Sequence, residues 1–163
     1  MVEGMNSASL ARAWRACPSQ TVTEVRRTAA NAHTVRIVRI VLAWLPAVAI
    51  ATVIFALSSL RDLHATTGTL EFVLRKGAHT TVYALLALTI VRGLHAHGLS
   101  GRAALSTAFL LAVAYAVSDE LHQTTVPTRH GAATDVAIDA IGSTAGLVLA
   151  TRPAVLRRLT AWT

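Results

Sequence analysis

The chain has 163 residues, the length of a single domain, and 53% of them are hydrophobic whereas only 14% are charged. Soluble domains carry about 25% charged residues, so the composition argues against a soluble globular protein and favours a membrane protein. The net charge of +7 comes almost wholly from arginines that flank apolar segments, which is typical of an oriented membrane protein rather than of a nucleic-acid-binding protein.

The N-terminal segment, residues 1–36, is polar and rich in Ala, Ser, Thr and Arg. We expect it to form a flexible basic cytosolic tail, in which a short helix near residues 22–34 could form. The single cysteine, Cys17, lies in this tail. The chain can therefore form neither an intrachain disulfide nor a cysteine-based metal cluster.

Four apolar segments follow. Residues 40–60 contain no charge and are long enough to span a membrane, which takes about 20 residues. Pro46 should kink this helix, as membrane helices tolerate. The other three segments reach spanning length only if each keeps polar residues at one end, and those residues must then face protein or water. The sequence thus predicts an all-α membrane protein, an antiparallel bundle of four transmembrane helices near residues 40–60, 74–95, 103–123 and 133–151. Residues 37–152 would form this domain, and residues 153–163 a short basic cytosolic tail.

The distribution of basic residues predicts the orientation of the bundle. Eleven of the fifteen lie in the N-terminal segment, the second loop and the C-terminal segment, and the other four lie in the first and third loops. Because cytoplasmic loops carry an excess of Lys and Arg, both termini should be cytoplasmic.

This topology brings the polar helix ends together at the extracytoplasmic face. Each helix also aligns its polar residues on one side, because residues three or four apart are neighbours on a helix surface. We therefore predict one connected polar pocket, formed by Lys76, His79, Tyr83, Asp119, Glu120, Gln123, Arg129, Asp135 and Asp139. Gly142 and Gly146 continue the last of these faces and should allow a second helix to pack closely.

Four stretches of the sequence resemble the VanZ-like family of membrane proteins, whose namesake is associated with resistance to the glycopeptide teicoplanin. They are "FALSSL", "RKGAHTTVYALLAL", "AYAVSDELHQTTVPTR" and "DVAIDAIGSTAG". The chain departs from the family pattern at Thr128, where glycine is usual, and at Asp139, where asparagine is frequent. The resemblance implies a multi-pass protein of the bacterial plasma membrane that affects peptidoglycan precursors or the access of the drug to them.

The chemistry of the predicted pocket allows several interpretations. His79, Asp119 and Glu120 are the candidate catalytic residues. Alternatively, Asp119 and Glu120 could pair with Lys76 and Arg129 and only hold the helices in register. Asp135 and Asp139 could share a proton or a divalent metal, but no ligand motif or cofactor motif is present.

Three hypotheses about function remain open. The protein could bind or modify a lipid-linked or cell-wall precursor at the extracytoplasmic face. It could be a hydrolase or transferase that uses acid/base catalysis. It could be a structural or accessory protein whose polar residues only lock the bundle. The lipid bilayer is an expected partner, nucleic acid is not, and the sequence does not predict the oligomeric state.

Overall fold

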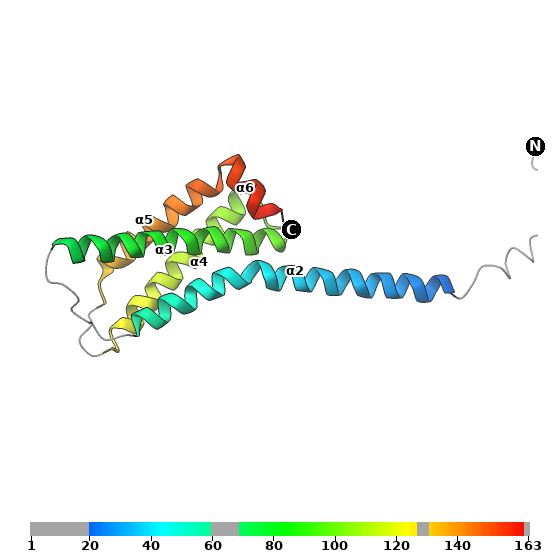
Figure 1. The fold of residues 1–163 in the computed structure, drawn as a ribbon, viewed down its shortest axis with the longest axis horizontal. Coiled ribbons are helices and arrows are strands. Elements are labelled where there is room, and N and C mark those ends of the chain that lie inside the picture. The colour runs from blue at the N-terminus through cyan, green and yellow to red at the C-terminus, as the bar shows by residue number, and fades with distance from the viewer. Residues whose placement is uncertain (1–19, 60–68, 127–130, 162–163) are drawn as a thin grey trace, which may run out of the picture. The chain divides into compact units, whose positions relative to one another are not determined.

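A computed structural model of the chain describes residues 20–59, 69–126 and 131–161, and their side chains within 24–59, 76–126 and 131–161. These residues form five α-helices and no strand (Figure 1). The helices are α2 (Gln20–Ser58), α3 (Thr69–Ala96), α4 (Gly101–Gln123), α5 (Ala133–Ala150) and α6 (Pro153–Thr160).

Four of the helices are long and apolar enough to cross a membrane, which confirms the predicted all-α membrane fold. The spans are Glu24–Ser58, Lys76–Ala96, Gly101–Gln123 and Ala133–Ala150. Many large apolar side chains on these helices are exposed, among them Leu45, Leu110, Leu121 and Ile141, each more than half exposed. Exposing so many apolar side chains is unfavourable in water but favourable in the hydrocarbon of a bilayer.

The structure differs from the expected helix boundaries at both ends of the chain. Helix α2 begins at Gln20, so the helix that could form near residues 22–34 is longer than expected and continuous with the first span. The segment from residue 19 to residue 45 contains neither glycine nor proline, so nothing in it interrupts the helix that leads into the apolar span. The C-terminal segment also contains a helix, α6, which was not predicted from the sequence. Pro153 stands at its start, where proline is favoured.

The core lies within the unit Arg39–Thr163 and is built largely from small residues. Helix α4 contributes an alanine every fourth position, at Ala104, Ala108, Ala112 and Ala116, and all four are buried. Small side chains let helices approach closely, which is how membrane helices gain packing contacts. The next position in this series is Glu120, so the alanine stripe of α4 ends in a carboxylate that points into the bundle.

Helices α3 and α5 run in the same direction, because the chain reverses before α4 and again after it (Figure 1). The two helices also pack closely against each other. A Cβ atom at Gly142 would lie 2.8 Å from the Thr80 Cα, and one at Gly146 would lie 2.9 Å from the Ala84 Cα. Both distances are too short for a real Cβ. The two glycines therefore let the backbones of α3 and α5 touch.

Two polar contacts attach α2 to the other helices. Pro46 lies inside α2 and has no N–H, so the carbonyl of Leu42, four residues earlier, loses its helical partner. The Arg92 Nη2 of α3 donates a hydrogen bond to this carbonyl at 3.4 Å. The hydroxyl of Tyr115 on α4 donates to the carbonyl of Ala51 at 2.5 Å. These bonds fix α2 against α3 and α4.

Candidate functional site

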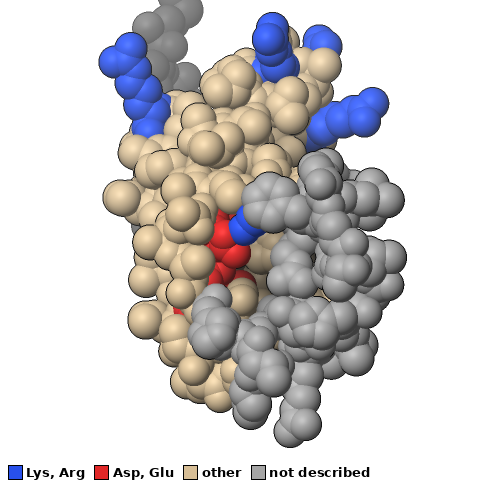
Figure 2. All heavy atoms as spheres, turned by 90° about the vertical axis from the view of Figure 1, so that its left-hand side faces the viewer, with Lys and Arg blue, Asp and Glu red and all other residues tan. Residues whose placement is uncertain are grey.

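The polar residues of the bundle gather where α2 and α4 end and where α3 and α5 begin. In each helix they continue the face that forms the core, so they point inward. Five polar side chains here are almost completely buried, with exposed fractions of 7% or less: Ser58, Asp119, Glu120, Gln123 and Asp139. Figure 2 shows acidic atoms recessed in this face of the molecule, with basic atoms beside them. We call this group, with Lys76, His79, Tyr83 and Asp135, the polar cluster.

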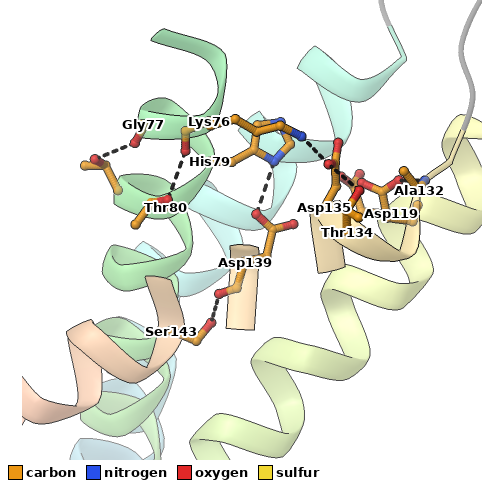
Figure 3. Close-up of polar contacts among 12 residues, drawn as sticks. Lys76, Gly77, His79, Thr80, Asp119, Ala132, Thr134, Asp135, Asp139 and Ser143 are labelled. Carbon is orange, nitrogen blue, oxygen red and sulfur yellow. Dashed lines mark hydrogen bonds and ion pairs between the residues drawn. The ribbon is translucent and has the colours of Figure 1, made fainter. Parts of the chain in front are cut away.

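Two contacts join α3 to α5 across the cluster. Lys76 Nζ forms an ion pair with Asp135 Oδ1, and both side chains remain about one-fifth exposed. One turn further along both helices, His79 Nδ1 lies 3.2 Å from Asp139 Oδ1, and Asp139 is completely buried. Figure 3 shows both α3 side chains directed toward the α5 carboxylates. The contacts continue the register set by Gly142 and Gly146.

The carboxylates of α4 have different partners from those expected. Glu120 Oε2 accepts a hydrogen bond of 2.8 Å from the backbone N–H of Ala132, just before α5. Asp119 Oδ2 accepts one of 3.1 Å from Gln123 Nε2. The structure shows Lys76 in an ion pair with Asp135, because the parallel register of α3 and α5 places Lys76, seven residues after the start of α3, beside the first turn of α5. Arg129, the other expected partner, lies outside the described residues.

Several buried polar atoms of the cluster have no hydrogen-bond partner among the described side chains and backbone. They are Asp119 Oδ1, Glu120 Oε1, Asp139 Oδ2 and the Tyr83 hydroxyl. A buried polar atom without a partner costs about 1–3 kcal/mol, so such atoms are rare unless a water, an ion or a ligand satisfies them. Four in one place make this cluster the strongest candidate site in the described part of the chain.

A small cavity of about 100 Å³ adjoins the cluster between α2 and α3. His79, Tyr83 and Ser58 line its polar side, and Ile54, Leu57 and Val82 line its apolar side. Pockets for whole small molecules usually measure about 300–1,000 Å³. This cavity is therefore large enough for only one functional group of a larger molecule.

The expected sharing of a metal by Asp135 and Asp139 has no support in the geometry. Asp135 is bonded to Lys76 and Asp139 to His79. Among the described residues, no group of three or more His, Cys, Asp and Glu side chains is arranged to hold a metal ion. Instead, the carboxylate oxygens that have no partner among the described residues lie near Lys76 and His79.

Some residues around the cluster were not predicted from the sequence. Ser143 is completely buried and donates to the carbonyl of Asp139, which fixes the helix beneath that carboxylate. Its position four residues after Asp139 could have identified it. His122 is half-buried, stacks on Phe55 with ring centroids 4.5 Å apart and lies 3.0 Å from Ser59 Oγ. That contact depends on how α2 lies against α4, which the sequence of α4 does not reveal.

The comparisons with known proteins agree with the fold. The model of the VanZ/LLP1 family matches residues 14–157, which is most of the chain and includes all the residues of the polar cluster. No curated protein and no solved structure matches the chain. With its four apolar spans, the protein is an integral membrane protein. The match over nearly its whole length shows that the chain belongs to the VanZ/LLP1 family.

Proposed function

We propose that the polar cluster binds the polar headgroup of a lipid-linked cell-envelope precursor, at the extracytoplasmic face of a bacterial plasma membrane. The observation that carries this proposal is the set of buried polar atoms without partners in the described residues. Three of them are carboxylate oxygens, which accept hydrogen bonds. The complementary ligand group is therefore a hydrogen-bond donor, such as a sugar hydroxyl, an amide or an amine.

The charge of the cluster supports a ligand of this kind. Four carboxylates come together at the end of α4 and the start of α5, and Lys76 forms an ion pair with one of them, Asp135. Burying surplus carboxylates is costly unless donors compensate them. A headgroup with several donors would provide that compensation, and the adjoining cavity between α2 and α3 would accept one of its substituents.

The location of the cluster and the family of the protein both favour a lipid-linked cell-envelope precursor as the ligand. The arginine distribution favours a cytoplasmic position for both termini, and the cluster would then face the outside of the cell. The family resemblance associates such proteins with teicoplanin resistance. Lipid-linked peptidoglycan precursors combine a membrane anchor with sugars and a peptide, so they offer many donors at this depth.

A binding measurement on the full chain in lipid nanodiscs tests the proposal, with a lipid-linked disaccharide-peptide precursor of peptidoglycan as the probe. Glu120→Gln retains an oxygen for the Ala132 N–H but replaces the open Oε1 acceptor by an amide NH2. We expect it to weaken precursor binding at least about ten-fold, the effect of losing one charge-assisted hydrogen bond. Glu24→Gln, the same change at an exposed position of α2, should leave binding unaltered.

Two results would overturn the proposal. One is a wild-type protein that does not bind the precursor. The other is a Glu120→Gln variant that binds as tightly as the wild type. Either result would mean that the open oxygen of Glu120 does not bind the precursor.

The His79–Asp139 pair favours a second candidate, an acid/base hydrolase or transferase. A carboxylate at one ring nitrogen orients an imidazole and stabilises its protonated form, which prepares the other nitrogen to move a proton. His79 also lines the cavity, together with Ser58. Turnover of the bound precursor by the wild type, and its loss with retained binding in His79→Gln, would establish this activity; binding without turnover would exclude it for this substrate.

A further inference from the structure

A second cavity, of about 500 Å³, lies at the opposite end of the bundle from the polar cluster. It is a partly open pocket, lined by residues from the end of α3, the start of α4, the end of α5 and helix α6. Its interior is mainly apolar, with Val91, Leu105, Ala150 and Leu156 among its lining residues. Its volume falls within the range of about 300–1,000 Å³ that is usual for ligand pockets.

The polar part of the cavity wall has positive character. Arg157 and His95 contribute side chains to it, and Ser100 and Gly101 form its border where α4 begins. No side chain caps α4 at Ser100, so the first N–H groups of that helix also favour an anion here. No acidic residue occurs in residues 91–118 or 140–163, the segments that supply the residues lining this cavity.

Helix α6 has the pattern of a helix at a membrane surface. Val155 and Leu159 are half-buried, whereas Arg157 and Arg158 are exposed. The helix packs against α3 and α5 just after the last membrane span. An amphipathic helix with arginines on its polar face typically lies in the headgroup region of a bilayer, where it attracts anionic lipids.

We propose that this cavity binds one anionic phospholipid. Its phosphate would lie at Arg157 and the start of α4, and the first part of an acyl chain would lie against Leu105, Val91 and Leu156. A lipid fits this cavity because the interior is mainly apolar and Arg157 lies at its rim. A free phosphate would leave the apolar interior unfilled. The proposal is independent of the function of the polar cluster, which lies at the other end of α4.

The test compares dioleoyl phosphatidylglycerol with dioleoyl phosphatidylcholine, each titrated into the full chain in dodecyl maltoside micelles. Native mass spectrometry measures the bound lipid, and thermal unfolding measures the stabilisation that binding produces. We expect tighter binding of phosphatidylglycerol. Arg157→Gln should weaken that binding by about five-fold, the effect of one basic residue near an anionic headgroup.

Arg158→Gln is the matched control, because Arg158 carries the same charge on the same helix but does not line the cavity. It should leave phosphatidylglycerol binding close to the wild-type value. Leu105→Trp, which fills the apolar interior, should weaken the binding of both lipids. The thermal stability of each variant without added lipid identifies any loss of fold.

Three results would overturn the proposal. Equal losses in Arg157→Gln and Arg158→Gln would mean diffuse attraction to a charged surface rather than a site. Equal binding of the two lipids would mean that the basic residues at the rim do not recognise the charge of the headgroup. Stabilisation by glycerol 3-phosphate as large as that by the lipid would mean that the headgroup alone is recognised.

Discussion

His79 Nδ1 lies 3.2 Å from Asp139 Oδ1, and this contact is one step in a continuous series between α3 and α5. The Lys76–Asp135 ion pair precedes it, and the backbone contacts of Gly142 with Thr80 and of Gly146 with Ala84 follow it. Polar pairs at one end and glycines along the rest thus specify a single register for two parallel helices. The same register leaves one oxygen of Asp139 without a partner among the described residues.

A double-mutant cycle of His79→Ala and Asp139→Ala measures the second step of this series. We expect a coupling free energy of about 1–2 kcal/mol, because each single variant leaves its buried partner uncompensated. Thermal or denaturant unfolding in detergent provides the values. His97→Ala combined with Asp139→Ala is the control and should be additive, since His97 contacts Trp44 rather than the cluster. Additivity of His79 and Asp139 would contradict the contact.

The glycines of α5 should be sensitive to a single added methyl group. Gly146→Ala places a Cβ against the Ala84 backbone, which cannot move aside, so it should destabilise the protein by about 1–3 kcal/mol. Gly77→Ala is the matched control in α3, because nothing lies within 4 Å of a Cβ there. It should leave the unfolding temperature unchanged or raise it. Equal unfolding temperatures for the two variants would mean that α3 and α5 are not packed backbone to backbone.

Arg92 should compensate for the proline in α2. Arg92→Gln weakens the hydrogen bond to the Leu42 carbonyl and should lower the free energy of unfolding. In a Pro46→Ala background, the new N–H of residue 46 can bond to that carbonyl, so part of the loss should disappear. We expect a coupling of about 1 kcal/mol, the worth of one hydrogen bond. If Arg92→Gln costs the same in both backgrounds, Arg92 stabilises the protein through other contacts.

Much of this fold can be predicted from the sequence because apolar length and residue spacing are local properties. They identify the four spans and the inward faces that carry Glu120 and Asp139. The partners of those side chains depend on the relative register of separate helices, which is why the ion pair between Lys76 and Asp135 was not predicted. No pattern within α3 alone contains that information.

The two helical extensions differ in how clearly the sequence indicates them. The N-terminal part of α2 is polar, so a search for apolar spans does not include it, although the absence of glycine and proline in residues 19–45 indicates a continuous helix. Helix α6 is only Pro153–Thr160, too short to span a membrane. Its amphipathic spacing, with Val155 and Leu159 on one side and arginines on the other, was the available signal.

The orientation of the bundle can be measured by cysteine labelling in a Cys17→Ser background. Thr125 follows α4 at the end that carries the polar cluster, and Ser100 precedes α4 at the opposite end; both are exposed. A cysteine at Thr125 should react with a membrane-impermeant maleimide from outside intact cells, and one at Ser100 should react only after lysis. The reverse pattern would place the polar cluster in the cytoplasm and contradict the positive-inside orientation.

The most direct measurement of the central claim is a structure of the full chain in lipid nanodiscs with the lipid-linked peptidoglycan precursor. We expect headgroup density between α3, α4 and α5, with a donor atom within hydrogen-bonding distance of Asp119 Oδ1, Glu120 Oε1 or Asp139 Oδ2. The claim is contradicted if the precursor is absent from the cluster and protein side chains, such as that of Arg129, occupy these three oxygens instead.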